Sequence, residues 1–306
     1  MALVFIAVLL AVLGLLISYI CFRMAFYASR KEDPNADEFA IPAGKIYEPF
    51  RETMVNWMKE VRAMPHEDMN IESFDGLTLR GKYYEYAPGA VIELMFHGYR
   101  GNAERDLCGG VHRCFALGRS ALIVDQRASG KSEGSIISFG VNESKDCHRR
   151  IEHTINHFGP DVKIILTGIS MGAATVLMAG GRELPPNVIG ILADCGYSSA
   201  EAIIKKVIRD MKLPPALVYP FIKLGAKLFG GFYLEETPPV EAVKKCKVPV
   251  IFFHGDDDRF VPCNMSKENF EACVSRKRLV ITPGAGHGLC YPVDSEAYLK
   301  ALREFF

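Results

Sequence analysis

The sequence lacks an excess of charge of either sign, and it lacks paired cysteine motifs. Across 306 residues, 36 lysine and arginine residues balance 36 aspartate and glutamate residues, so no overall field favours nucleic acid or an acidic partner. No CxxC pair occurs among the nine cysteines, which argues against a zinc ribbon or a thioredoxin-like motif. An odd number of scattered cysteines instead favours reduced thiols in a reducing compartment.

Internal repeats and low-complexity segments are also absent, while 49% of the residues are hydrophobic. A chain of this length and composition has enough apolar material for one large domain with a buried core. His153 and His157 are spaced for one face of an expected helix, but no third metal ligand lies near them in the sequence. We therefore expect neither a metal site nor a cofactor site.

The first 22 residues carry no charged side chain. Residues 2–22 form an apolar run of the ~20 residues that cross a hydrocarbon core, which predicts a transmembrane signal anchor over residues 1–22. A cleaved signal peptide is the alternative, but it would need a basic segment before a shorter run. Arg23, Arg30 and Lys31 follow the run, so the positive-inside rule predicts a single-pass protein whose remaining residues lie on the cytoplasmic side.

Residues 23–69 are predicted to contain a linker and one amphipathic helix. Residues 31–45 are polar and include proline, a composition typical of a linker. From Tyr47 to Val61, apolar side chains recur at helical spacing among charged ones. This helix either packs on the following domain or lies on the lipid surface beside the anchor.

Residues 70–306 alternate between short apolar runs and helical patterns. A turn at Asp75-Gly76 predicts two antiparallel strands, and six β-rich runs follow, from "VIELMFHG" to "KRLVITPG". Helices are predicted between them, for instance over residues 142–157, 171–180, 265–274 and 294–305. Uniformly apolar strands are typical of a parallel sheet with helices on both faces. A hydrophobic helical insertion interrupts the alternation at about residues 198–238, and we expect it to form a cap over the site.

The pentapeptide "GISMG", residues 168–172, fits G-x-S-x-G and lies between a predicted strand and a predicted helix. That context is the one expected of a nucleophile elbow. A Cβ at either flanking position would crowd so sharp a turn, and the helix amino terminus favours developing negative charge. Ser170 is therefore the predicted nucleophile. The alternative is a structural serine at a tight turn.

A serine nucleophile needs a base and a group that orients the base. His287 follows the run "KRLVIT", and the carboxylates Asp256, Asp257 and Asp258 follow the run "VPVIFFHG". The order serine, aspartate, histidine along the chain is that of α/β-hydrolases. Asp194, at the end of an earlier predicted strand, is an alternative acid.

By these motifs the sequence resembles the α/β-hydrolase superfamily over residues 70–306, and more narrowly its serine esterase branch akin to prolyl-oligopeptidase-like hydrolases. The resemblance implies an α/β fold with a mostly parallel eight-stranded sheet, helices on both faces and a small helical cap insertion. Within "HGDDDRFVP" it selects Asp258 as the acid, with Asp256 expected to cap the loop. Within "FHGYRGN" it implies an oxyanion hole made by the backbone N–H groups of Tyr99 and Met171.

Two further histidines and one further loop are expected to be structural. His97 and His254 each precede a glycine near the end of a predicted strand, where a hydrogen-bonding role is favoured over catalysis. "DQRASGKSEG" resembles a structural loop of the same superfamily, with Ala128 in place of its usual glycine. Asp125 stands where a phosphate-binding P-loop needs glycine, so no nucleotide is expected.

The sequence thus predicts a serine hydrolase that cleaves carboxylic esters or thioesters of short to medium acyl chains through an acyl-enzyme on Ser170. The expected partners are a small-molecule or lipid ester and, through the N-terminal helix, a membrane. One alternative is a peptidase of prolyl-oligopeptidase-like type, although the chain has no room for a β-propeller domain. The other is a catalytically silent, membrane-anchored interaction module.

Overall fold

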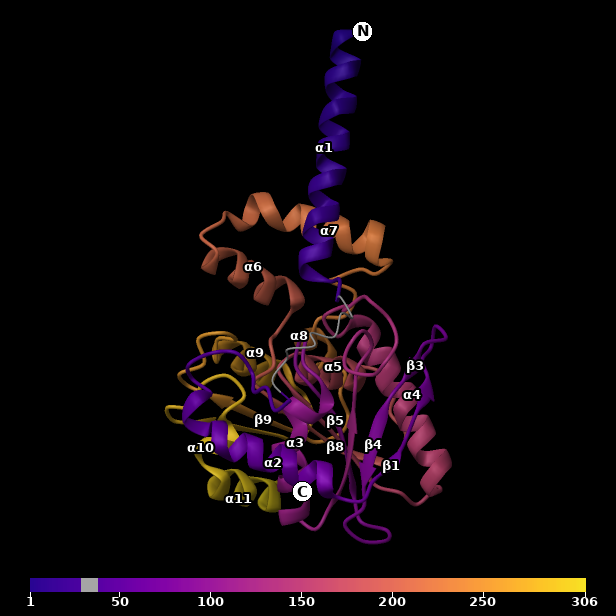
Figure 1. Ribbon diagram of the computed structural model, residues 1–306, viewed down its shortest axis with the longest axis vertical. Helices are drawn as coiled ribbons and strands as arrows, with labels where there is room; N and C mark the ends of the chain where they lie inside the picture. The colour runs from indigo at the N-terminus through magenta and orange to yellow at the C-terminus, as the bar shows by residue number, and fades with distance from the viewer. Residues whose placement is uncertain (29–37) are drawn as a thin grey trace.

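The computed structural model describes residues 1–28 and 38–306. Arg30, Lys31 and the first part of the predicted linker lie outside the described residues. Helix α1 (Ala2–Ala25) projects from a rounded body that the other described elements form (Figure 1). Of the helices in the described part of the chain, α1 alone is long and apolar enough to cross a membrane, by length and composition.

A central sheet holds eight strands in the order β1-β4-β6-β5-β7-β8-β9-β10. Its strands are β1 (Glu67–Asp68), β4 (Gly81–Tyr84), β5 (Ile92–Phe96), β6 (Ser120–Val124), β7 (Ile164–Ile169), β8 (Val188–Asp194), β9 (Val250–Gly255) and β10 (Lys277–Thr282). The strands from β6 to β10 in this order run parallel, and β4 pairs antiparallel with both β1 and β6. The predicted mostly parallel eight-stranded sheet is confirmed.

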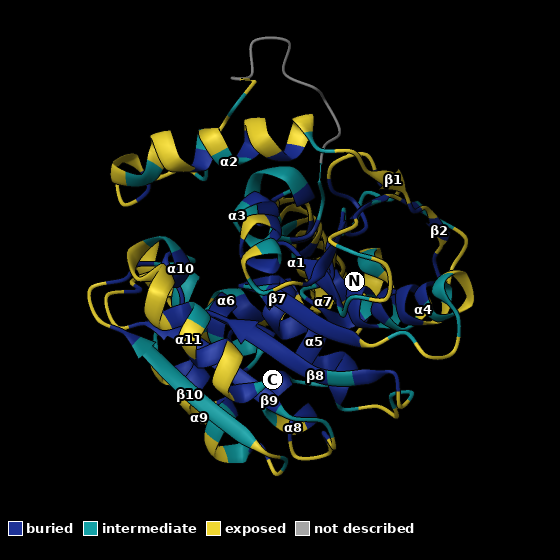
Figure 2. Cartoon of the chain, turned by 90° about the horizontal axis from the view of Figure 1, so that it is seen from below, coloured by how far each residue is buried: buried dark blue, intermediate teal, exposed yellow. Residues whose placement is uncertain are grey.

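Helices cover both faces of the sheet, as predicted. On one face α4 (Val141–Phe158), α5 (Met171–Gly180) and the segment after α8 (Pro239–Ala242) share a buried apolar cluster with the strands. On the other face α3 (Ala103–Ala116) and α11 (Ser295–Phe305) form two further clusters. The short elements η1 (Glu48–Phe50), α9 (Asn264–Ala272) and α10 (Cys290–Val293) complete the body. Figure 2 shows the inner strands as mostly buried.

The predicted hairpin around Asp75-Gly76 is split between two sheets. Strands β2 (Ile71–Glu72) and β3 (Thr78–Leu79) pair antiparallel in a small sheet, whereas β4 joins the central one. The buried guanidinium of Arg150 stands where they diverge, donating to the backbone oxygens of Met69 at 2.5 Å and Arg80 at 2.7 Å. A side chain from a distant helix thus replaces ladder hydrogen bonds that a single hairpin would have made.

The predicted amphipathic helix is α2 (Arg51–Ala63), and it packs on the body. Met54, Met58 and Val61 are buried, and the helix lies against α3. Its outer face is exposed (Figure 2), and it lies on the part of the body distant from the free end of α1 (Figure 1). Of the two hypotheses for this helix, the structure supports packing on the domain.

The hydrophobic insertion forms α6 (Ala200–Asp210) and α7 (Pro215–Gly230), and α7 lies across the lower part of α1 (Figure 1). Helices α1 and α7 approach closely at Gly225 of α7, where a Cβ would lie 2.5 Å from the backbone oxygen of Ser18 of α1. The ring of Phe229 contacts Tyr19 and Phe22, with centroid separations of 5.2 Å and 5.9 Å. Small residues at a helix crossing allow such close backbone contact.

The end of α1 is part of the core of the body. Phe26 is fully buried, and its ring packs edge-on against Phe139 at 5.6 Å and Phe232 at 5.2 Å. The backbone continues this attachment, because Ile137 N–H donates to the Phe26 oxygen at 2.8 Å and Ala28 N–H donates to the Ser135 oxygen at 2.9 Å. Helix α1 and the body are therefore packed together as one folded unit.

Truncating Phe26 tests this packing. We expect Phe26→Ala to lower the free energy of unfolding by about 3–5 kcal/mol, because a buried aromatic ring would leave a cavity. Met24→Ala, two residues earlier in α1, is the matched control, since that side chain is 60% exposed. Its expected effect is within about 0.5 kcal/mol. Denaturant unfolding in detergent, followed by the fluorescence of Trp57, measures both variants, and equal losses would contradict the assignment.

Candidate active site

Ser170 is the single residue between the end of β7 and the first residue of α5. Its backbone is left-handed, with φ of 57°, and its N–H donates to the Asp194 oxygen at 2.8 Å. A Cβ on Gly168 would lie 2.1 Å from the oxygen of Gly172, and a Cβ on Gly172 would lie 2.0 Å from the oxygen of Phe96. Both glycines are therefore required by close packing, and the turn holds Ser170 in a strained conformation.

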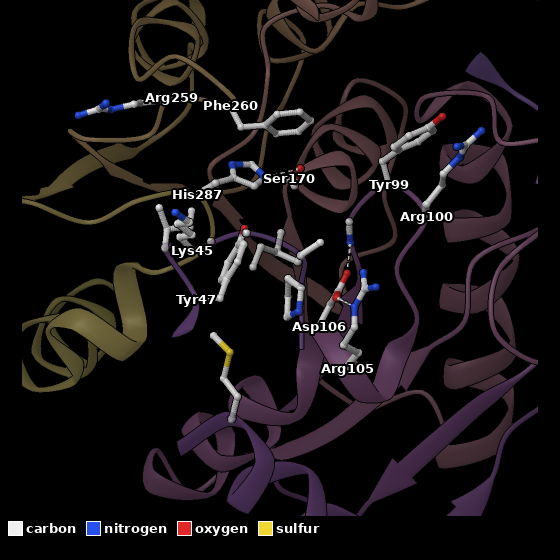
Figure 3. Close-up of a pocket in the computed structure, with 18 of the residues that line it drawn as sticks. Lys45, Tyr47, Tyr99, Arg100, Arg105, Asp106, Ser170, Arg259, Phe260 and His287 are labelled. Atoms are coloured by element: carbon white, nitrogen blue, oxygen red, sulfur yellow. Dashed lines mark hydrogen bonds and ion pairs between the residues drawn. The ribbon is translucent and has the colours of Figure 1, made fainter. Parts of the chain in front are cut away.

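His287 lies between Ser170 and Asp258. Its Nδ1 is 2.7 Å from Asp258 Oδ2, and its Nε2 is 2.9 Å from Ser170 Oγ. Because the carboxylate can only accept, Nδ1 carries the proton and Nε2 is free to accept from the serine hydroxyl. Figure 3 shows the His287 ring directed at Ser170. The structure thus brings together three side chains that lie far apart in the sequence.

The Asp258 carboxylate is buried and receives several hydrogen bonds besides that from His287. The backbone N–H groups of Phe260 and Val261 donate to Oδ1 at 2.9 Å and 2.8 Å, and His254 Nε2 lies 3.2 Å from Oδ2. Burial by itself would raise the pKa of Asp258, but the hydrogen bonds from His254 and His287 outweigh it and lower that pKa below its usual value. Asp258 is held as the carboxylate.

The neighbouring carboxylates have other partners. Asp256 Oδ1 accepts from the Gly284 N–H at 2.6 Å, so it caps the loop as expected. Asp257 is exposed and pairs with Arg259 at 3.1 Å. Of the three adjacent aspartates, Asp258 is the one that contacts the imidazole.

Asp194, the alternative acid, faces another part of the core. Its Oδ2 accepts from the hydroxyl of Tyr298 at 2.9 Å. Burial raises the pKa of Asp194, although the hydrogen bond from Tyr298 acts in the opposite direction. Its backbone oxygen, which accepts from Ser170 N–H, is the part of this residue that supports the site.

His97 and His254 are both buried and hydrogen bonded to structural partners. His97 Nδ1 lies 2.7 Å from the Gly98 oxygen, and its Nε2 accepts from the Gln126 N–H at 3.0 Å. His254 Nδ1 lies 2.7 Å from Ser266 Oγ, and His254 Nε2 lies 2.8 Å from the Val261 oxygen. His97 supports the loop after β5, while His254 supports the loop that carries Asp258.

Tyr99 and Met171, whose N–H groups were predicted to form the oxyanion hole, lie on either side of Ser170. A Cβ on Gly98, which precedes Tyr99, would be 3.5 Å from Ser170 Cβ. Met171 is the first residue of α5, where the backbone N–H has no partner within the helix. Both donors therefore belong to segments adjoining the serine, and their catalytic role remains a prediction.

The side chains of Tyr99 and Arg100 connect this loop to α1. The Tyr99 hydroxyl donates to the Ala25 oxygen at 2.7 Å, and Arg100 Nη2 donates to the Met24 oxygen at 2.8 Å. Arg100 also has a left-handed backbone, with φ of 54°. Two side chains of the loop therefore satisfy carbonyl groups at the end of α1, which lack partners within the helix itself.

Ser170 and His287 open into a pocket of about 900 Å³. Ile46, Tyr47 and Phe260 provide apolar wall, and the Phe260 ring lies edge-on to the His287 ring at 5.1 Å. Charged side chains also line it: Lys45, Arg100, Arg105, Asp106, Lys206, Asp210, Asp257 and Arg259. The pocket combines an apolar wall beside the serine with many charges, and several of these residues are labelled in Figure 3.

One wall of this pocket comes from residues 42–47, which sequence reasoning assigned mainly to a linker. Ile46 Cδ1 would lie 3.2 Å from a Cβ on Gly286, next to His287. The only sequence signal was the apolar pair Ile46-Tyr47 after a polar stretch. From the insertion, in contrast, Lys206 and Asp210 of α6 line the pocket, and the apolar side chains of α7 do not.

Cys195, Asp258 and His287 place potential ligand atoms within 4.8 Å of one another. Asp258 and His287 are already hydrogen bonded to each other, however. Burial raises the pKa of the Cys195 thiol well above its usual value, which disfavours the thiolate that a metal would bind. This group suits a histidine oriented by a carboxylate better than it suits a metal ion.

Adding a methyl group at Gly172 tests the packing of the turn. We expect Gly172→Ala to lower the free energy of unfolding by about 1–3 kcal/mol, because the new Cβ would overlap the Phe96 oxygen. Gly14→Ala is the control, since its Cβ would meet its nearest neighbour at 3.8 Å. Thermal unfolding followed by circular dichroism compares them, and the packing argument is wrong if Gly172→Ala is as stable as Gly14→Ala.

Comparisons with known proteins agree with this architecture. No protein-family model matches the chain. The uncharacterized protein YqkD of Bacillus subtilis is 29% identical over 241 residues, which cover 77% of each chain. An esterase of Pyrococcus furiosus superposes with a TM-score of 0.67 at 21% identity, covering 87% of this chain and 95% of that one. The alpha/beta hydrolase GrgF of Penicillium sp. sh18 superposes with a TM-score of 0.62 at 17% identity, covering 79% and 98%. The chain therefore has the α/β-hydrolase fold.

Proposed function

We propose that this protein is a membrane-anchored serine hydrolase that cleaves carboxylic esters or thioesters of short to medium acyl chains. The observation that carries the proposal is the hydrogen-bonded series Ser170, His287 and Asp258, of which Ser170 and His287 line a large pocket. The apolar wall beside the serine supports an acyl group as the bound part of the substrate. The P. furiosus protein of the same fold is described as an esterase.

In the first half of the reaction, His287 Nε2 takes the proton of Ser170 as Oγ attacks the acyl carbon. His287 then gives that proton to the leaving alcohol or thiol, which leaves an acyl-enzyme on Ser170. In the second half, His287 removes a proton from water, the hydroxide attacks the acyl carbon, and Ser170 recovers its proton. Asp258 fixes the Nδ1 tautomer and stabilises the imidazolium in both halves.

Negative charge on the tetrahedral oxygen would be stabilised by the backbone N–H groups of Tyr99 and Met171. The N–H of Met171 lies at the amino end of α5, where the helix dipole also favours an anion. Both donors belong to rigid surroundings, because close packing at Gly172 fixes α5 and the contacts of Tyr99 with α1 fix the other loop.

We further propose that α1 crosses a membrane and that the body lies on its cytoplasmic side. Arg23, in the last turn of α1, and the basic residues after it support this orientation. The nine cysteines are all unpaired thiols, which suits a reducing compartment.

Covalent labelling tests the nucleophile. A fluorescent phosphonate should label the wild-type protein at Ser170, identified by peptide mapping, because the phosphonate mimics the tetrahedral intermediate and traps the serine. Ser170→Ala should abolish labelling. Labelling that persists in the variant would show that Ser170 is not the nucleophile.

Replacing the acid tests the orientation of the base. Asp258→Asn should lower kcat for p-nitrophenyl esters by roughly 10⁴-fold, because an amide in this position favours the wrong tautomer of His287. Asp257→Asn, the exposed neighbour, should retain activity within a few fold, and far-UV circular dichroism checks that both variants are folded.

A series of p-nitrophenyl esters of increasing acyl chain length, measured beside aminoacyl-nitroanilides, separates esterase from peptidase activity. Preferred cleavage of the anilides would contradict the proposal.

A further inference from the structure

Helix α7 buries one face and exposes a second apolar face. Its buried residues pack on the body and on α1: Tyr219, Ile222, Gly225 and Ala226. On the opposite side Leu217, Leu224 and Leu228 are 68%, 38% and 49% exposed. Their spacing of seven and four residues places them in one stripe along the helix, and we call these three residues the leucine face. An apolar stripe turned away from the core requires a partner or a lipid phase.

The leucine face and the exposed part of α1 belong to the same end of the molecule. In Figure 1, α7 lies across α1, and α1 continues beyond the crossing away from the body. The large apolar side chains of α1 before Gly14 are exposed, from Leu3 to Leu13. Because Gly225 of α7 contacts Ser18 and Phe22 of α1, the crossing is tight and holds the two helices together.

The length of α1 requires α7 to lie at the level of the lipid. Its contact with α7 begins at Gly14, where a Cβ would be 3.8 Å from Phe221. The part before Gly14 is only about 18 Å long at ~1.5 Å per residue, which is shorter than a hydrocarbon core of ~30 Å. A span of ~20 residues that starts at Ala2 ends near Cys21, within the part of α1 that α7 contacts. An anchor that spans the bilayer therefore brings α7 to its surface.

The charge of the insertion favours an anionic lipid surface. Across the insertion, residues 198–238, six lysine and arginine residues exceed four acidic ones, although the whole protein has no net charge. Lys212, just before α7, and Lys227 of α7 are exposed, whereas Lys223 pairs with Glu235. Lysines beside an apolar stripe can bind lipid phosphates while the stripe enters the acyl region.

We propose that α7 is an interfacial helix that docks on a bilayer containing anionic lipids, with the leucine face inserted between the lipids. This inference rests on the proposed anchoring by α1, and it adds a second membrane contact that fixes the orientation of the body. The pocket lies near the proposed membrane contact of α7. Lys206 and Asp210 of the preceding helix α6 line the pocket, and Arg100, which also lines it, donates to a carbonyl group at the end of α1. The substrate class that fits this arrangement is an ester carried by a lipid at the membrane surface.

Depth-dependent quenching of tryptophan fluorescence tests the contact. Leu217→Trp is made in the full-length chain and reconstituted in vesicles of phosphatidylcholine and phosphatidylglycerol, with and without lipids brominated near the headgroup end of the acyl chain. Val274→Trp is the matched control, because Val274 is an apolar residue that is 69% exposed. It lies before the amino end of β10, whereas the site lies beyond the carboxyl end of that strand. Trp57, the one native tryptophan, gives the background.

We expect brominated lipid to quench the signal that Leu217→Trp adds by about half or more, and to leave the signal added by Val274→Trp unchanged. Equal behaviour of the two variants would overturn the docking of α7. Resistance to alkaline carbonate extraction is measured on the same vesicles. If the protein stays in the vesicles after carbonate treatment but the added tryptophan signal is not quenched, the docking of α7 alone is rejected. If carbonate extracts the wild-type chain, the proposed anchoring by α1 is rejected as well.

The second experiment compares a soluble substrate with a membrane-borne one. The double variant Leu217→Glu, Leu224→Glu should keep its rate on soluble p-nitrophenyl butyrate and lose about fivefold or more on a fluorogenic ester carried by a lipid in the same vesicles. Val274→Glu should keep both rates. Equal rates on vesicles for the double variant and the wild type would overturn the proposal. A change in oligomer size in detergent, with the vesicle rate unaltered, would instead identify the leucine face as a protein interface.

Discussion

The contact between the amino end of α5 and the ends of β5 and β7 is the constraint on which the site depends. Gly172 lies so close to the Phe96 oxygen that no larger residue fits, and Ser170 is therefore held in a left-handed conformation. This strain is sustained because α5 is buried along its whole length between the sheet and α4. The serine is positioned by the packing of the core. His287, from the loop after β10, contacts the serine, and Asp258, from the loop after β9, contacts His287.

Helix α1 is built into this same framework. Phe26 lies in the apolar cluster that also contains Met171, the residue after the serine. Tyr99 and Arg100 bind carbonyl groups in the last residues of α1, so the loop beside the serine and the end of α1 stabilise each other. The position of α1 and the geometry of the pocket therefore depend on shared contacts.

Local patterns in the sequence predicted most of the sheet and the residues that meet at Ser170. Strands such as β5 and β7 are short, apolar and bounded by polar residues, and the glycines around Ser170 carry a requirement that is local to one turn. The pocket wall at residues 42–47 could not be predicted, because it depends on where a polar segment lies after the chain has folded. The position of α7 across α1 could not be predicted for the same reason, since a hydrophobic helix has the same composition whether it covers a pocket or packs on another helix.

Residues 42–47 lead into η1 and α2 and also form a wall of the pocket. Ile46 lies against the loop of His287, and Tyr47 is buried with Met54 and Leu289, so the segment is held on the body at both of these points. An insertion or deletion within residues 42–47 would therefore change the shape of the space beside Ser170. The room next to the serine is thus set partly by a segment far in the sequence from the strands that carry Ser170, Asp258 and His287.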